Sequence, residues 1–189
     1  TTENTPDGFR LQETDRLGGS DIQTLNLNFT GDASKSTDFL DEDNQWLEFE
    51  DERYRAATDA HFMAEFTHDY FLEKFQHVGY DGEGGLILSY MNYGFEGFFN
   101  AFYNGLFLAF GDGEGDPLSS PDIFAHEFAH GVTDHTSDLI YAAEPGALNE
   151  SFSDIFGNTL EHALDPDKFT WYVGEDIRRF RNMADPNEF

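Results

Sequence analysis

Two histidines four residues apart, in the segment His126-Glu127-Phe128-Ala129-His130, constrain this chain more than any other feature of its sequence. Residues i and i+4 lie on the same face of an α-helix, so a helical conformation would let both imidazoles reach one metal ion. The preceding Ser120-Pro121-Asp122 supplies a capping serine, a proline suited to the first helical position and an acid for the first turn. We therefore predict a helix from this cap through about Thr136.

A second pair of side chains with the same spacing follows twenty residues after His130. Glu150 and Asp154 are expected on one face of a further helix, over Ala147–Ala163. With the two histidines, Glu150 would form a His₂Glu set that leaves a fourth zinc position open to water, as in catalytic rather than structural sites. Glu127 would lie close enough to such a water to take its proton, and Asp154 could orient a ligand histidine from behind.

Two plainer interpretations stand beside this one. The histidine pair could be an accidental pattern on an exposed helix. Glu150 and Asp154 could be a solvated acidic face, which is common in a chain with 38 acidic residues. Their combination at this separation favours a metal site over both.

The charge of the chain restricts its partners. With 38 acidic and 10 basic residues the formal net charge is −28. Nucleic acids and anionic membranes are not expected as partners, because Lys and Arg dominate phosphate binding. The acidity indicates either a strongly hydrated surface suited to high salt, which the presence of only three lysines favours, or calcium ligation by part of the acids.

Composition also limits the chemistry and the location. No cysteine occurs, so disulfides, thiolate ligands and a thiol redox role are excluded. No apolar run approaches the ~20 residues of a membrane helix, and the first residues are neither basic nor apolar. A mature, processed product would look like this, and so would a cytosolic protein.

The distribution of apolar residues predicts an α+β fold. Residues 1–56 alternate polar and apolar in short bursts, which is typical of strands and turns. Apolar residues at helical spacing then predict a helix over about 58–77, with Thr58 or Asp59 as its N-cap.

Strand character returns at Leu86–Tyr93 and Leu106–Phe110, between glycine-rich turns. We expect a strand-rich N-terminal lobe with one long helix over residues 1–119. The metal-binding helices and the start of a helical domain would follow over residues 120–189.

Taken together, these segments resemble the thermolysin family of zinc metalloendopeptidases. The likeness runs from about Asp41 to the C-terminus, and the first forty residues match only loosely. Besides the helix with both histidines, the matching segments are Asp43-Asn44-Gln45, Ala57-Thr58-Asp59-Ala60-His61-Phe62, Asn100-Ala101-Phe102-Tyr103-Asn104-Gly105, Asp138-Leu139-Ile140-Tyr141 and Asn149–Asp154.

The resemblance implies the central chemistry. His126, His130 and Glu150 would bind zinc, and Glu127 would be the general base for the attacking water, with Asp154 behind the ligands. The reaction would be hydrolysis of peptide bonds on the N-terminal side of bulky hydrophobic residues.

The same resemblance implies the substrate contacts. Asn100 and Ala101 would lie on an edge strand that pairs with a peptide substrate. Tyr141 would donate to the developing oxyanion, and Arg181 would hold a substrate carbonyl beside the S1′ pocket. The apolar wall of that pocket would comprise Leu118, Ile123, Val173 and Phe180. Plainer interpretations are a polar turn residue for Asn100, a core tyrosine for Tyr141 and ordinary core for the wall.

A calcium site is also implied, with Asp122, Glu161 and Glu175 at the matching positions. Thr170 and Tyr172 stand where well-calcified relatives have acids, so we expect one ion rather than two, with Asp165 or Asp167 as substitute ligands. The remaining histidines show no ligand spacing, and no metal role is expected for His61, His68, His77, His135 and His162.

The family places a further histidine in its C-terminal helical domain, and this sequence has none after His162. We therefore expect that domain to be largely missing from the chain, supplied by a partner chain or absent. The resemblance implies a secreted enzyme, freed of its signal and propeptide. The rival hypothesis is a catalytically incomplete metal-binding fragment that serves as an interaction module.

Overall fold

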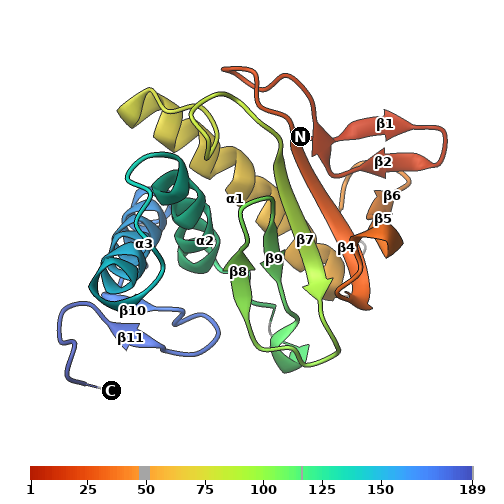
Figure 1. Ribbon diagram of the computed structural model, residues 1–189. Coiled ribbons are helices and arrows are strands. Elements are labelled where there is room, and N and C mark those ends of the chain that lie inside the picture. Colours follow the sequence, from red (N-terminus) through yellow and green to blue (C-terminus); the bar gives the residue numbers. More distant parts are fainter. Residues whose placement is uncertain (47–51, 116, 189) are drawn as a thin grey trace.

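The computed structural model describes residues 1–46, 52–115 and 117–188 and has the expected α+β organisation (Figure 1). Its main layer is a mixed six-stranded sheet of order β3-β4-β7-β9-β8, with β5 paired to β4. These strands are β3 (Gln12–Glu13), β4 (Ile22–Thr30), β5 (Thr37–Asp38), β7 (Ile87–Tyr93), β8 (Ala101–Tyr103) and β9 (Leu108–Phe110). The pairs β4–β7 and β7–β9 are parallel, whereas β8 runs antiparallel to β9 and ends the sheet.

Three long helices pack together: α1 (Glu52–Phe75) lies against β4 and β7, α2 (Pro121–His135) lies against β8, and α3 (Ala143–Leu164) packs on α2. Alanines let α1 approach closely, since Ala57, Ala60 and Ala64 are fully buried beside Ile87 and Met91 of β7 in one core cluster. In Figure 1, α2 lies between α3 and the β8 end of the sheet. None of the helices in the described ranges is long and apolar enough to cross a bilayer.

Short elements complete the chain. A three-stranded sheet comprises β1 (Glu3–Thr5), β2 (Gly8–Arg10) and β6 (Leu40–Asp41), and a two-stranded one comprises β10 (Tyr172–Val173) and β11 (Arg181–Asn182). The 3₁₀ turns are η1 (Ala33–Lys35) and η2 (Gly113–Gly115). One core cluster contains residues from both expected parts of the chain, so the division at residues 119 and 120 stays a prediction.

The helix predictions were most accurate where a capping signal was present. The predicted second helix is confirmed, because α2 begins at Pro121 after the N-cap residue Ser120 and ends at His135. The serine hydroxyl donates to Asp122 Oδ1 at 2.7 Å rather than capping a backbone amide. The third helix begins at Ala143, four residues before the predicted Ala147.

The predicted start of the first helix was wrong. Helix α1 already includes Glu52, and Thr58 lies inside it with its hydroxyl donating to the Arg55 carbonyl at 2.8 Å. The residues just after Glu52 form helix readily, but they do not continue the apolar stripe on which the prediction depended.

Candidate active site

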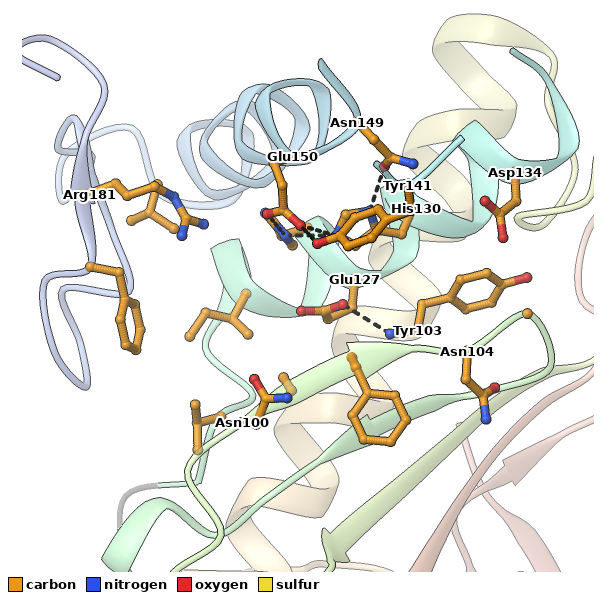
Figure 2. A pocket seen from close by; sticks show the side chains of 18 of the residues that line it. Asn100, Tyr103, Asn104, Glu127, His130, Asp134, Tyr141, Asn149, Glu150 and Arg181 are labelled. Carbon is orange, nitrogen blue, oxygen red and sulfur yellow. Dashed lines mark hydrogen bonds and ion pairs between the residues drawn. The ribbon is translucent and has the colours of Figure 1, made fainter. Parts of the chain in front are cut away.

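A cleft of about 450 Å³ separates the edge strand β8 from helices α2 and α3 (Figure 2). Its floor is β8, its wall is α2 and α3, and Arg181 of β11 closes one end. Every residue proposed from the sequence for zinc, catalysis or substrate lines this cleft except Asp154, which lies behind the wall.

The two histidines of α2 point to the same place. Their Nε2 atoms are 3.0 Å apart, and the Glu150 carboxylate of α3 lies 3.4 Å from Nε2 of His126 and 3.5 Å from Nε2 of His130. Two ligands of a tetrahedral zinc ion with bonds of about 2.0–2.1 Å are roughly 3.3 Å apart. The three donors are therefore spaced as ligands of one small cation.

The rear nitrogens of both imidazoles are also held. Nδ1 of His130 lies 2.6 Å from Oδ1 of Asn149 and 3.1 Å from the Ser153 hydroxyl. Nδ1 of His126 lies 2.9 Å from Asp154 Oδ1, although it is not aligned for a full hydrogen bond. Acceptors behind Nδ1 favour the tautomer that leaves Nε2 free to bind a metal.

Arg181 reaches Asp154 from β11. Its Nε donates to Oδ2 at 2.7 Å and its Nη2 to Oδ1 at 2.6 Å, a bidentate pair. Burial alone would raise the pKa of Asp154, but contacts with His126 and Arg181 lower it overall. Asp154 thus stays ionised and connects the His126 imidazole to the Arg181 guanidinium at the end of the cleft.

The carboxylates around His126 favour a positive charge at its ring. Burial opposes protonation of His126, but Asp154 and Glu150 outweigh it and raise the pKa to about 9. The contact with His126 in turn lowers the pKa of Glu150 to about 2. The same field would stabilise a metal cation at the Nε2 side.

Glu127 lies within the cleft but outside the three-donor set. Its Oε2 accepts a hydrogen bond from the backbone N–H of Tyr103 on β8 at 3.0 Å, and the residue is 7% exposed. Burial is the main cause that raises the pKa of Glu127 to about 7, where a carboxylate can both take and return a proton near neutral pH. A cation held by the neighbouring donors would favour its ionised form.

Tyr141 lies over the donor set. Its hydroxyl donates to Glu150 Oε1, which is the largest cause that raises the pKa of Tyr141 to about 12. The side chain is 67% exposed, so it can leave Glu150 for a bound ligand, and it is not the core tyrosine of the plainer interpretation.

Strand β8 offers an unpaired edge to the cleft. Ala101 begins the strand opposite Phe110, and the preceding Asn100 accepts a backbone hydrogen bond from Gly111 at 2.9 Å. Strand β9 is its only partner among the described strands, which leaves its other edge for a bound peptide.

The residues expected for the apolar wall gather at the Arg181 end. Leu118, Ile123 and Val173 are buried, and the half-buried Phe180 packs its ring 5.8 Å from that of Phe99. All four line the cleft.

A second group of metal-binding type combines Asp122 of α2 and Glu161 of α3 with Glu175, which follows β10. Ligand atoms of Asp122, Glu161 and Glu175 lie within 4.8 Å of one another. Burial, then repulsion by the neighbouring acids, raises the pKa of Glu161 to about 8. Oε2 of Glu161 and Oε2 of Glu175 are buried without a hydrogen-bond partner among the described residues. Thr170, where the sequence lacks an expected acid, still contacts this group, because its hydroxyl donates a hydrogen bond to Glu175.

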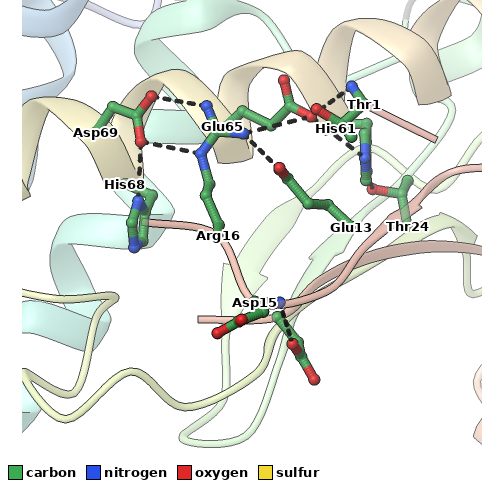
Figure 3. A network of polar contacts seen from close by, with 10 residues as sticks. Thr1, Glu13, Asp15, Arg16, Thr24, His61, Glu65, His68 and Asp69 are labelled. Carbon is green, nitrogen blue, oxygen red and sulfur yellow. Dashed lines mark hydrogen bonds and ion pairs between the residues drawn. The ribbon is translucent and has the colours of Figure 1, made fainter. Parts of the chain in front are cut away.

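Acids gather around Arg16 in a different way (Figure 3). The guanidinium forks onto Asp69 with distances of 2.9 Å and 2.6 Å, contacts Glu13, and lies 3.7 Å from Glu65. Burial opposes this charge, but the acids raise the pKa of Arg16 overall. This acidic cluster contains its own cation, whereas no Lys or Arg is paired with Asp122, Glu161 or Glu175 in the described ranges.

Sequence reasoning missed some contributors. Asn149 and Ser153 stand in the matching segment beside Glu150, but their contact with His130 depends on how α3 packs on α2. The Tyr103 amide and Asp134 carry no local signal. Among the other histidines none joins a metal group in the described residues, and His61 and His68 are buried on α1.

Comparison with known proteins agrees with the geometry. The family model for the thermolysin metallopeptidase catalytic domain matches residues 1–134, and that for the thermolysin metallopeptidase alpha-helical domain matches residues 137–189. Bacillolysin of Brevibacillus brevis is 39% identical over 179 residues, which cover 93% of this chain and 31% of that protein. Thermolysin of Alicyclobacillus acidocaldarius subsp. acidocaldarius is 40% identical over 164 residues, which cover 80% of this chain and 29% of that protein.

A solved structure is also similar, that of the precursor of protealysin, a metalloproteinase from Serratia proteamaculans. The TM-score is 0.77 at 27% identity, with 93% of this chain and 56% of that chain covered. The chain thus spans about a third of the length of the curated relatives it matches.

Proposed function

This chain belongs to the thermolysin family of metallopeptidases, and we propose from that premise that it is a zinc-dependent endopeptidase. The observation that carries the proposal is the three-donor set of His126, His130 and Glu150, with Nε2 atoms 3.0 Å apart and acceptors behind both rings. A His₂Glu set leaves one zinc position open, which suits catalysis.

Zinc would supply a Lewis acid that polarises the scissile carbonyl and lowers the pKa of water. Glu127, fixed by the Tyr103 amide, would take the proton of the attacking water and pass it to the leaving amine. Asp154 would keep the His126 ring in place through the contact at Nδ1.

The peptide substrate would add a strand to the open edge of β8. Asn100 and Ala101 would align its backbone, and Arg181 would hold a substrate carbonyl with the part of its guanidinium that Asp154 does not occupy. Tyr141 would exchange its bond with Glu150 for one to the developing oxyanion.

The apolar end of the cleft supports the cleavage preference. Leu118, Ile123 and Val173 present buried apolar surface beside Arg181, where a bulky hydrophobic residue just after the cut would be desolvated. We therefore propose hydrolysis on the N-terminal side of such residues.

The carboxylates Asp122, Glu161 and Glu175 would hold one calcium ion. Calcium prefers hard oxygen donors, and the buried unbonded oxygens of Glu161 and Glu175 are costly without a cation. The ion would stabilise the packing of α2 on α3 rather than take part in catalysis.

The acidity of the chain and its family also support a proposal about where the enzyme works. We propose an extracellular enzyme, and a surface of net charge −28 would suit high salt. Peptides and proteins are the proposed substrates.

The alternative is an incomplete metal-binding fragment that works as an interaction module or with a second chain. One observation favours it. Leu148, Phe152 and Ile155 lie at helical spacing on α3 with exposed fractions of 51%, 44% and 44%. Such an apolar face indicates a surface that a further polypeptide could cover.

Metal analysis tests the zinc site directly. The chain should retain about one zinc ion per molecule after desalting, and His130→Ala should lose it, because two protein ligands rarely hold zinc tightly. His135→Ala is the matched control, since His135 lies on the same helix but outside the donor set, where it bonds the Gly131 carbonyl and packs its ring 5.7 Å from that of Tyr80. Equal zinc retention by His130→Ala would overturn the assignment.

A further inference from the structure

Asp134 occupies the end of the cleft opposite Arg181. It lies one helical turn after His130 on α2 and lines the cleft, and its side chain is exposed. No hydrogen bond or ion pair to Asp134 occurs within the described residues, although salt bridges are common elsewhere in this chain. The catalytic role proposed above does not use this carboxylate.

A second unpaired group lies at the same end. The hydroxyl of Tyr103 is buried, and it has no hydrogen-bond partner in the part of the chain that the structure describes. The ring packs edge-on to Tyr80 at 5.5 Å and passes beside Gly131, where an added Cβ would come within 3.3 Å of Cε2 of Tyr103. Glycine at 131 therefore makes room for this ring against α2, three residues before Asp134.

Asp134 and the Tyr103 hydroxyl form one feature of the cleft. Figure 2 shows both at the end remote from Arg181, on the same side of the donor set. Burial raises the pKa of Tyr103, and the charge of Asp134 adds to that effect, so the hydroxyl stays protonated and keeps its lone pairs as acceptors. A carboxylate and a hydroxyl acceptor, both unpaired, are suited to an ammonium or guanidinium group.

The direction of β8 decides which part of a substrate would reach this place. In Figure 2 the strand follows Asn100, on the Arg181 side of the cleft, and runs toward Tyr103 and Asn104, on the Asp134 side. A peptide paired antiparallel to β8 would place its C-terminal part at Arg181 and its N-terminal part at Asp134. Arg181 is the only Lys or Arg that lines the cleft in the described ranges, so the cleft is positive at one end and negative at the other.

We propose that Asp134, with the Tyr103 hydroxyl, forms a subsite that selects a lysine or arginine side chain N-terminal to the scissile bond. This specificity rests on the proposed peptidase function and on antiparallel pairing with β8. The cationic head would pair with Asp134, and its aliphatic stem would lie along the Tyr103 ring.

Matched peptides test the subsite. Each has one leucine after the intended cut and either lysine, glutamine or glutamate at successive positions N-terminal to it. A parallel set carries the same residues on the C-terminal side. Binding of the labelled peptides to the zinc-loaded chain is measured by fluorescence anisotropy, and kcat/KM is measured for each peptide that is cleaved.

Lysine should be preferred over glutamine about fivefold at one N-terminal position, as for a partly exposed ion pair supported by a hydroxyl. The lysine-to-glutamine ratio should fall to about one in Asp134→Asn and invert in favour of glutamate in Asp134→Lys. Tyr103→Phe should reduce the ratio by a smaller factor. Asp138→Asn is the matched control, because it removes an equal charge just beyond α2, outside the cleft lining, and should keep the ratio.

The outcomes separate the two proposals. Peptide binding without a lysine preference, a preference that survives Asp134→Asn, or a preference confined to the C-terminal set would each overturn the subsite alone. A lysine preference in binding with no cleavage of any peptide would contradict the peptidase function while supporting the subsite. Failure to bind any peptide would overturn both.

Discussion

Helices α2 and α3 contribute to two candidate metal sites that differ in their donors and in their access to solvent. The site at the cleft combines two imidazoles with Glu150, and Tyr141 above it is largely exposed. The other site, of Asp122, Glu161 and Glu175, contains oxygen donors only, and two of its oxygens are buried with no hydrogen-bond partner in the described part of the chain. One helix pair thus separates a site suited to chemistry from a site suited to stability.

The cause of the difference lies in what surrounds each carboxylate. Glu150 has the His126 ring and the Tyr141 hydroxyl as partners, which lower its pKa to about 2 overall. Glu161 has acids as its neighbours, and its pKa rises to about 8. A carboxylate near imidazoles is stable before a metal binds, whereas a carboxylate among carboxylates needs a cation or a proton.

The largest expected effect separates chemistry from binding at the cleft site. Glu127→Gln keeps the shape of the side chain but cannot accept the water proton, so kcat should fall by about 10²–10⁴. Zinc content should stay at the parental level, because Glu127 is not one of the three donors. Peptide hydrolysis and metal analysis on the same sample check both claims.

Asp138→Asn, an acid outside the cleft lining, should leave hydrolysis unchanged. Loss of zinc from Glu127→Gln would make the glutamate a ligand or a structural element. Full activity would mean that another group moves the proton.

The carboxylate site should respond to calcium in stability and not in chemistry. Calcium at about 100 times its dissociation constant would add about 2.7 kcal/mol, or roughly 5–10 °C in melting temperature. In Glu161→Gln this rise should largely disappear, and without calcium the variant should be no less stable than the parent, because the glutamine amide, like the protonated carboxyl, carries no charge among the neighbouring acids.

Thermal melts with and without millimolar calcium measure this effect. Glu144→Gln, an exposed acid in the first turn of the same helix, should keep the full calcium response. An undiminished response in Glu161→Gln would place the ion elsewhere. A loss of zinc in that variant would remove the distinction between the two sites.

A buried ionisable side chain can also remain neutral instead of binding a cation. His61 on α1 is the example to compare with the two metal sites. The ring is 2% exposed, its Nδ1 lies 3.0 Å from the Thr24 hydroxyl, and burial lowers its pKa to about 4. The unfolded histidine titrates near 6.5, so its neutral form stabilises the fold above pH 6.5 and this contribution is lost as the pH falls toward 4.

At pH 5 the loss should be on the order of 2 kcal/mol. Urea unfolding at pH 7 and pH 5 measures it, and His61→Gln, which does not titrate, supplies the reference. If parent and variant lost the same stability, the buried neutral histidine would not be its source.

The smallest effect is that of nonspecific screening. Molar salt shortens the Debye length to about 3 Å and should relieve the self-repulsion of a −28 chain, raising the melting temperature modestly. The rise should persist in Glu161→Gln, unlike the calcium effect. Melts that are flat in salt would remove the high-salt interpretation.

Local spacing explains how much of the site could be predicted from the sequence. The pairs His126 with His130 and Glu150 with Asp154 each lie on one helix, where i and i+4 determine the shared face. The structure brings both pairs together, and the α+β fold was predicted from periodicity alone. The predicted bounds of helix α2 were accurate because Ser120 and Pro121 mark its start.

Contacts between distant segments could not be predicted in this way. The Tyr103 amide meets Glu127 only because β8 ends the sheet beside α2, and Asn149 reaches His130 only through the packing of α3. The early start of α1 was missed because its first turn lacks the apolar stripe. The roles of Tyr141 and Arg181 came from family resemblance and stay predictions, since the structure shows them paired with Glu150 and Asp154.

The most direct test of the central claim is peptide hydrolysis by the 189-residue chain before and after removal of zinc. We predict cleavage before leucine or phenylalanine that a zinc chelator abolishes and that added zinc restores, in calcium throughout so that the carboxylate site stays filled. Hydrolysis that continues in the chelated protein, with zinc verified as absent, would contradict the assignment of His126, His130 and Glu150 as the catalytic metal site.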